Sequence, residues 1–373
     1  MKRTQFLSWW LLSFTALACA KPPVVAVSPA AEPARARNVT FISTSDCHYK
    51  AFEAANWNRA NRETIAEMNR ISSLTWPAKL GGGAIQKPRG VLVLGDCIDD
   101  GDKVRNGKDY TAAQYKAFTA DFGLDGTDGL VKYPVYEGWG NHDGPPAGAG
   151  KSSVSFQAEL KKRNAIRKAR GWLAGLSDNG LHYSWDWDDI HFVQLNIYPA
   201  DSQNPKVRYN PNWHNPQGAL SFLKKDLKRC VGTSGRPVVL TSHCGFDTNW
   251  WHADDWKAVY EAVKPYNVVL YLYGHTGTGF RKWAPPGEEP RWLCVNDGHT
   301  TSGFFLIQFL GDRVRLAYRH KEGQKVTRNR DDGSYDLQWS GRWVWRFLMD
   351  LKVPSGRPAN QPAAPESKTG PKT

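Results

Sequence analysis

Beyond its first 20 residues the chain lacks any run of about 18 or more apolar residues, so no later segment is expected to span a bilayer. Glycine and proline, at 34 and 23 of 373 residues, are too few for a collagen-like or low-complexity protein. Hydrophobic residues make up 40%, which excludes bulk disorder. No internal repeat is present. The chain is therefore mainly globular, and one large catalytic domain with tails fits its length.

Acidic residues are outnumbered by basic ones. The 36 Asp and Glu residues against 49 Lys and Arg residues give a net charge of +13. This balance favours an anionic partner such as a phosphate ester, a nucleic acid or a lipid head group. The sequence contains no basic-aromatic nucleic-acid module, so we expect a phosphorylated small molecule or lipid head group and no nucleic acid.

Residues 1–20 have the pattern of a signal peptide, with a basic start, an apolar run over Phe6–Leu17 and small residues after it. The stretch Thr15–Cys19 resembles a bacterial lipobox, which predicts lipidation of Cys19 and anchoring to a membrane. The alternative is cleavage at Ala18–Ala20, which would give a soluble periplasmic or secreted protein. Either outcome places the mature protein outside the cytoplasm.

The rest of the chain divides by composition into four parts. Residues 21–37 form a Pro/Ala-rich tether. Residues 38–322 alternate β-rich runs with amphipathic stretches, which indicates a layered α/β domain. Residues 323–352 are basic and aromatic, and form either a last packed segment or a membrane-facing one. Residues 353–373 form a disordered tail.

Hydrophobic periodicity locates the main elements of the domain. Strands are expected at Val39–Thr44, Val91–Leu94, Pro134–Gly138, Leu181–Asn196, Val238–Ser242, Val268–Tyr273, Phe304–Phe309 and Val314–Tyr318. Helices are expected at Arg59–Leu74, Thr111–Phe122, Ser155–Leu173, Gly218–Cys230 and Asp254–Val263.

Polar residues follow five of these strands. The five motifs are Asp46-Cys47-His48, Gly95-Asp96-Cys97-Ile98-Asp99, Gly140-Asn141-His142-Asp143, Ser242-His243 and Gly274-His275. Carboxylate and amide oxygens combined with imidazoles suit Zn, Mn or Fe. Loops at the carboxyl ends of strands are where α/β sheets gather ligands. One strand-end histidine alone is more often structural, but five such motifs in order predict a metal site.

In this order the motifs resemble the calcineurin-like metallophosphoesterase superfamily, whose pattern is D-x-H, G-D-x-x-D, G-N-H-[DE], a lone His and G-H-x-H. The resemblance extends from Asn38 to Tyr318. It implies an α/β layered sandwich of two mixed β-sheets flanked by helices, with two divalent or trivalent metal ions at the carboxyl ends of the strands. The implied ligands are Asp46 and His48 for the first ion, Asp96 for both, and Asn141, His243 and His275 for the second.

The resemblance also implies a reaction, the hydrolysis of phosphate monoesters or diesters. A hydroxide that bridges two cations about 3.5–4 Å apart is a nucleophile at neutral pH. His142 would be the general acid that protonates the leaving group, and Asp143 or Asp99 would orient it.

One position departs from the family pattern, because Gly277 stands where the second histidine of G-H-x-H would join the first metal. Three replacements are open: His299, His252 or a water molecule, with His299 and water ahead of His252. On sequence alone, a loop histidine bonded to backbone is the commoner role for His299.

The gap at Gly277 keeps an alternative function open. A non-catalytic or weakly active envelope lipoprotein could bind a phosphorylated or glycan ligand through a degenerate metal site. The presence of His142 argues against it, since a binding protein has no need of a proton donor. A nuclease is conceivable on charge alone.

Three other features allow two interpretations each. Cys47, Cys97 and Cys244 flank expected ligands and should pack in the core, although Cys47 and Cys97 could form a disulfide. Without Cys19 five cysteines remain, so at least one is unpaired. The aromatics of 246–251 line the pocket mouth or pack on the sheet. The basic residues of 161–170 form a solvated face or contact an anion or membrane.

Overall fold

The computed structural model describes residues 37–145, 150–201, 217–246 and 252–354. The expected signal peptide, Cys19, almost all of the tether and the tail from residue 355 lie outside these ranges, as does 247–251. Within them, no helix combines the length and the apolar character needed to cross a membrane.

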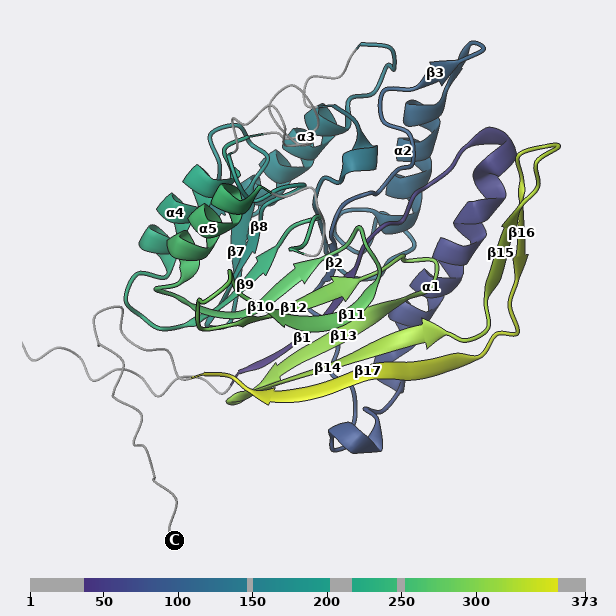
Figure 1. Cartoon of the computed structure of the whole chain (residues 1–373). Helices are drawn as coiled ribbons and strands as arrows, with labels where there is room; N and C mark the ends of the chain where they lie inside the picture. Colours follow the sequence, from purple (N-terminus) through teal and green to yellow (C-terminus); the bar gives the residue numbers. More distant parts are fainter. Residues whose placement is uncertain (1–36, 146–149, 202–216, 247–251, 355–373) are drawn as a thin grey trace, which may run out of the picture. The chain divides into compact units, whose positions relative to one another are not determined.

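Six strands form the first sheet, in the order β17-β14-β13-β1-β2-β5 (Figure 1). The three strands that precede expected motifs, β1, β2 and β5, are parallel to one another, and the others pair antiparallel. Their bounds are β1 Asn38–Thr44, β2 Val91–Val93, β5 Val135–Glu137, β13 Gly303–Leu310, β14 Arg313–Lys321 and β17 Trp343–Lys352.

Seven strands form the second sheet, in the order β11-β12-β10-β9-β8-β7-β6. The central strands β8, β9, β10 and β12 are parallel. Their bounds are β6 Gly175–Leu176, β7 Tyr183–Trp187, β8 Ile190–Gln194, β9 Pro237–Thr241, β10 Asn267–Tyr273, β11 Thr278–Trp283 and β12 Trp292–Asp297. The single run expected at Leu181–Asn196 is thus a hairpin, turned at Asp188, which has a positive φ of 52°.

All five expected helices are present, with ends within a few residues of the prediction. They are α1 Asn58–Arg70, α2 Tyr110–Phe122, α3 Phe156–Ala169, α4 Ala219–Cys230 and α5 Ala253–Val263. Four short 3₁₀ helices accompany them: η1 Phe52–Trp57, η2 Ile71–Ser73, η3 Ala78–Leu80 and η4 Asn141–Asp143. Two small hairpins complete the fold: β3 Val104–Arg105 with β4 Lys108–Asp109, and β15 Lys325–Arg328 with β16 Tyr335–Gln338.

Apolar residues of the two sheets pack in two layers. One core lies between the sheets and includes Phe41 and Leu92 of the first and Phe192 and Leu272 of the second. The other faces of both sheets pack on the helices, as Ile42 of β1 does. Alternation of side chains along each strand explains how neighbours such as Phe41 and Ile42 join different cores. The fold is the expected sandwich of two mixed sheets flanked by helices.

The basic, aromatic segment after residue 322 contains strands. β17 pairs with β14 along almost its full length. Arg313 lies opposite Lys352 at one end of the pairing, and Lys321 lies opposite Trp343 at the other. This pairing makes β17 an edge strand of the six-stranded sheet, so the segment packs against the domain.

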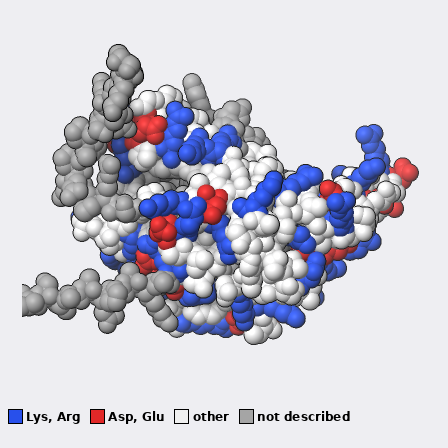
Figure 2. Space-filling view, turned by 90° about the horizontal axis from the view of Figure 1, so that it is seen from below, with Lys and Arg blue, Asp and Glu red and all other residues white. Residues whose placement is uncertain are grey.

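Two of the six basic residues in the run 161–170 on α3 are structural. Arg163 and Arg167 face inward and bind the buried carboxylate of Glu137 on β5. Lys161, Lys162 and the other basic residues of this run stay exposed or partly exposed. The run is therefore partly a buried ion-pair network that holds α3 on the sheet, which the sequence pattern did not indicate. On the face shown in Figure 2, Lys and Arg side chains are spread widely among Asp and Glu.

The disulfide between Cys47 and Cys97 that the sequence allows is not formed. All five cysteines in the described ranges are free thiols, and Cys47, Cys97 and Cys244 are fully buried in the core. Burial raises the pKa of the Cys47 thiol far above its ordinary value. These cysteines are small apolar packing residues beneath the strand ends.

Candidate metal centre

The loops that carry the five motifs are hydrogen-bonded to one another. The N–H of Asp46 donates to the carbonyl of Gly95 at 3.1 Å, and the N–H of His48 to that of Asp96 at 2.9 Å. In the second sheet, the N–H of Gly274 donates to the carbonyl of His243 at 2.9 Å. Because β1 and β2 are parallel, and so are β9 and β10, their carboxyl ends meet and bring these loops together.

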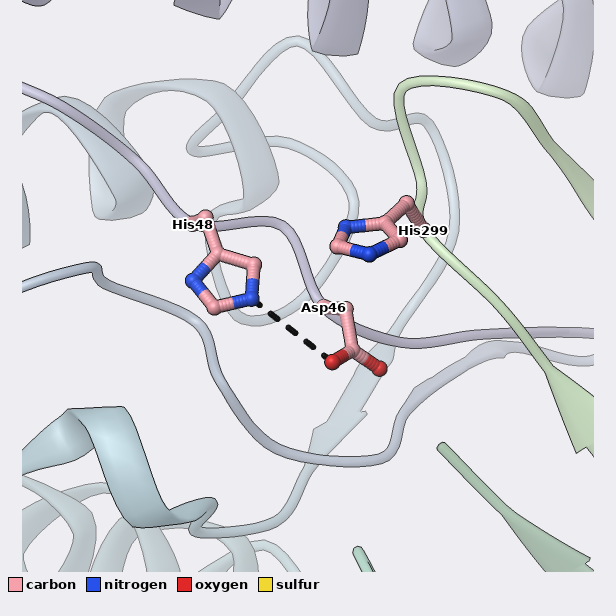
Figure 3. A group of neighbouring side chains, drawn as sticks. All are labelled: Asp46, His48 and His299. Atoms are coloured by element: carbon pink, nitrogen blue, oxygen red, sulfur yellow. Dashed lines mark ion pairs between the residues drawn. The ribbon is translucent and has the colours of Figure 1, made fainter. Parts of the chain in front are cut away.

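Asp46, His48 and His299 form the first group of ligand atoms (Figure 3). One ligand atom from each lies within 4.8 Å of the other two. Nε2 of His48 is 3.6 Å from Oδ1 of Asp46. The His299 ring stacks on the His48 ring, with 5.4 Å between the centroids and 29° between the planes.

Asp96, His243 and His275 form the second group, with ligand atoms again within 4.8 Å of one another. Nε2 of His243 is 3.2 Å from Oδ2 of Asp96 and 3.0 Å from Oδ1 of Asn141. The same Oδ2 of Asp96 is 3.7 Å from Nε2 of His48 in the first group. Asp96 therefore lies between the two groups, where the resemblance expects a shared ligand.

His299 is brought to Asp46 by a strand that the sequence analysis missed. β12 runs parallel to β10, so the residues after it emerge beside the loop that carries His275. His299 then forms an isolated parallel β-bridge with Ser45, and the N–H of Thr300 donates to the carbonyl of Ser45 at 2.8 Å. A sixth polar motif after the apolar residues of β12, Asn296-Asp297-Gly298-His299, was the available signal.

Neither His252 nor position 277 places an imidazole in the first group of ligand atoms. His252 belongs to neither group of ligand atoms and instead has Nδ1 3.7 Å from a carboxylate oxygen of Asp254. Gly277 has φ of +151°, which side chains rarely adopt, although the space beside it is open. The backbone at 277 is thus shaped for glycine, and the imidazole beside Asp46 and His48 comes from His299.

Four of the expected ligands have a strained backbone. Asp46, His48, Asp96 and His275 all have positive φ, between 44° and 74°. Each such residue costs about 1–3 kcal/mol and persists only where its surroundings fix it. The inter-loop hydrogen bonds supply that constraint, and the N–H of His275 adds one to Oδ2 of Asp46 at 2.9 Å. Strain at four expected ligands is typical of a functional site.

His142 lies at the exposed rim of the centre. Its ring contacts the edge of the His48 ring at 4.6 Å between centroids, and its Nδ1 is 2.8 Å from the backbone carbonyl of Asp99. Since a carbonyl can only accept, Nδ1 must carry the proton of this bond. Nε2 has no hydrogen-bond partner among the described residues.

Asp143 does not have the expected position beside the His142 ring. Its two carboxylate oxygens accept the N–H groups of Ile98 at 2.9 Å and Gly140 at 2.7 Å. Burial and the charge of Asp96 raise the pKa of Asp143 well above its usual range. Asp143 therefore holds the loops together through backbone N–H groups, and of the two residues expected to orient His142, Asp99 makes the contact with its ring through the backbone carbonyl.

The side chain of Asp99 contacts His48, a member of the first group of ligand atoms. Its Oδ1 is 3.1 Å from Nδ1 of His48, and its Oδ2 is 2.6 Å from Nζ of Lys50. A carboxylate on Nδ1 orients the ring and leaves Nε2 of His48 directed at Asp46 and Asp96. This pairing is the arrangement that a metal-binding histidine requires.

The carboxylates and the histidines of the centre shift one another's pKa values. Burial alone would raise the pKa of Asp46 and of Asp96, but His48 and His243 hold both below the usual range. Burial alone would lower the pKa of the two histidines, but hydrogen bonds to Asp46 and Asp99 raise that of His48 to about 10. The charge of Asp96 raises the pKa of His243 to about 9.

The donor atoms fit a pair of metal ions. Each group presents a carboxylate and two imidazoles, a set that suits Zn, Mn or Fe. Burial and the charge of His243 lower the pKa of His275 to about 4, so its ring is neutral and has a lone pair for a cation. Nε2 of His243 lies close to oxygen atoms of both Asn141 and Asp96. Ligands that share one metal ion are arranged in this way.

Comparison with known proteins identifies the domain. A family described as calcineurin-like phosphoesterase matches residues 39–278, more than half of the chain. No curated protein matches the chain.

Three solved structures show distant likeness. GAP50, described as the anchor in the inner membrane complex of Plasmodium, is 11% identical with a TM-score of 0.48, covering 87% of this chain and 92% of that one. A 5'-nucleotidase from Candida albicans is 11% identical with a TM-score of 0.38, covering 73% and 48%. Vps29 from Chaetomium thermophilum is 9% identical with a TM-score of 0.31, covering 85% and 100%. At these scores the likeness bears on neither activity nor partner.

The raised pKa values predict that metal binding competes with protons. At pH 7 the metal-free protein carries protons on His48 and His243, whose pKa values are about 10 and about 9. Metal binding at pH 7 should therefore release about two protons, and the affinity should rise with pH until these histidines lose their protons unaided. Calorimetric titration of Mn²⁺ in buffers of different ionisation enthalpy measures the release. Affinity that stays constant from pH 6 to pH 9 would contradict the protonated state.

Proposed function

The chain belongs to the calcineurin-like phosphoesterase family, and on that premise we propose that it hydrolyses phosphate monoesters or diesters outside the cytoplasm, using two metal ions. The observation that carries the proposal is the convergence of two carboxylate-imidazole groups on Asp96. The proposed substrate is a phosphorylated small molecule or lipid head group, in keeping with the net charge of +13.

Each ion would be held by side chains from several loops. The first set is Asp46, His48 and His299, the second is Asn141, His243 and His275, and Asp96 is shared by both. When bound, two such ions neutralise the phosphoryl oxygens and lower the pKa of a coordinated water. The chain itself fixes the spacing of the ligands through the inter-loop hydrogen bonds and the strained backbone.

His142 is proposed as the general acid. The Asp99 carbonyl accepts from Nδ1 and thereby leaves Nε2 as the nitrogen that faces substrate. In the imidazolium form Nε2–H donates its proton to the departing ester oxygen, and the ring returns to neutrality. Contact with the His48 ring keeps this donor beside the first group.

The non-catalytic alternative depended on a gap in the first metal site at Gly277. With His299 beside Asp46 and His48, that argument for a degenerate site no longer applies. The strain stored at the ligands also supports a reactive centre.

The proposed location rests on the N-terminal sequence alone. Lipidation at Cys19 would hold the enzyme at a membrane, and cleavage at Ala18–Ala20 would release it. Incorporation of labelled fatty acid at Cys19 distinguishes these two locations.

Asp96→Asn tests the proposed function. The wild-type protein should hydrolyse p-nitrophenyl phosphate or bis(p-nitrophenyl) phosphate only with a divalent metal ion, and a chelator should abolish the rate. Asp96→Asn should lose about 10³-fold or more in kcat, because this carboxylate contacts both groups. Asp312→Asn, on an exposed turn, is the control and should keep the full rate. Full activity of Asp96→Asn with bound metal would exclude the two-metal arrangement.

His142→Ala tests the proton donor. The variant should retain metal and lose about 10²–10⁴-fold in rate on alkyl phosphates, whose leaving groups need a proton. The loss on p-nitrophenyl phosphate should be much smaller, since that leaving group departs as an anion. Equal losses on both substrates would remove His142 from this role.

His299→Ala tests the replacement ligand. Calorimetric titration should show the affinity for one of two metal ions falling at least about 10-fold, while the other is unchanged. The matched control is His252→Ala, which should leave both affinities intact. Gly277→His should not restore binding in His299→Ala, because the φ of +151° opposes a side chain there. Unchanged affinities in His299→Ala would mean that water, not His299, completes the first site.

A further inference from the structure

We propose that a cavity beside the metal centre binds a second phosphate group of the substrate. The cavity has a volume of about 240 Å³, and its lining includes Lys50, Asp99, Arg105, Tyr110, Arg328 and Tyr335. This inference rests on the proposed function and names a feature of its substrate, a bisphosphorylated compound or a head group with two phosphates.

The cavity and the metal centre share one wall. Asp99 lines the cavity and also holds Nδ1 of His48 at 3.1 Å. Lys50, on the cavity side, binds the other oxygen of the same carboxylate at 2.6 Å. The cavity therefore adjoins the first group of ligand atoms at Asp99, and the proposed substrate spans the two.

Charge in the cavity is left uncompensated at two positions. Among the lining residues, Lys50 pairs with Asp99, Lys103 with Asp100 at 2.5 Å, and Glu53 pairs with Lys108 at 3.7 Å and accepts from Tyr110 at 2.7 Å. Every lining carboxylate thus has a cationic partner.

The guanidinium groups of Arg105 and Arg328 remain without such partners. Neither has a side-chain hydrogen bond or an ion pair with another residue in the part of the chain that the structure describes. Two free positive charges match the two negative charges of a phosphate monoester, and guanidinium binds phosphate oxygens in pairs.

The wall that carries Arg328 is held firmly in place. The β15–β16 hairpin lies beside α1 (Figure 1). It is bonded to η1, which precedes α1: the N–H of Tyr335 donates to Oδ1 of Asn56 at 3.1 Å, and the Asn56 amide donates back to the Tyr335 carbonyl. The Tyr335 ring packs edge-on against Trp57, with 5.0 Å between centroids. Nζ of Lys50 lies over both rings, 5.2 Å and 5.5 Å from their centroids. The hairpin follows the family match of 39–278, so the family match does not itself account for Arg328.

Arg105→Gln and Arg328→Gln test the cavity with two matched substrates. Wild-type kcat/KM should be roughly tenfold higher for glucose 1,6-bisphosphate than for glucose 6-phosphate, and each variant should lose most of this preference. Arg330→Gln, a charge-matched control on the same hairpin outside the cavity lining, should retain it. All variants should hydrolyse p-nitrophenyl phosphate at the wild-type rate.

A binding measurement separates this inference from the proposed function. Metal-depleted protein should bind inorganic phosphate in calorimetric titration, and the double variant of Arg105→Gln with Arg328→Gln should not. If neither the wild-type protein nor any variant hydrolyses p-nitrophenyl phosphate with metal, the proposed function fails. The phosphate titration still tests the cavity in that case. Equal substrate preference in wild type and both variants, or phosphate binding unchanged in the double variant, would overturn the inference.

Discussion

The carboxylate of Asp96 is the contact on which the arrangement of the centre depends. Its Oδ1 accepts the N–H of His142 at 2.8 Å, while Oδ2 lies near Nε2 of His243 at 3.2 Å and of His48 at 3.7 Å. Three strand-end loops are thus positioned by one side chain. Gly140 is required beside it, because a Cβ there would lie 2.2 Å from Asp96. The positions of the expected metal ligands and of His142 are therefore set together.

Sequence periodicity and motif order predicted much of this molecule. The five helices lie close to the ranges expected from residue spacing, and the five polar motifs follow strands whose parallel pairing brings them together. The strand β12 was missed because its pairing with β10 and β11 is set by tertiary structure, so the sequence left His299 and water as equal candidates beside Asp46. The expected core packing of Cys47 and Cys97 is confirmed, and the alternative disulfide between them is not formed.

Side-chain roles within a motif were harder to predict than its position. Adjacency in sequence suggested that Asp143 orients His142, yet the turn of η4 directs the Asp143 carboxylate to backbone N–H groups. The inward direction of Arg163 and Arg167 likewise depends on Glu137, which lies on a distant strand. Such contacts between distant segments are decided by packing, and a single sequence carries no signal for them.

Residues after 278 contribute to both the candidate metal centre and the cavity beside it. The family match covers the five motifs, whereas His299 and the β15–β16 hairpin follow it. With glycine at position 277, His299 provides the second imidazole beside Asp46 in the first group. The hairpin adds Arg328 to a cavity that adjoins the first group at Asp99.

Anomalous diffraction from crystals grown with Mn²⁺ tests the central claim most directly. The account predicts two peaks, one among Asp46, His48 and His299 and one among Asp96, His243 and His275, with the Asp96 carboxylate between them. A single peak, or a first site in which the His299 ring points away from the metal, would contradict it.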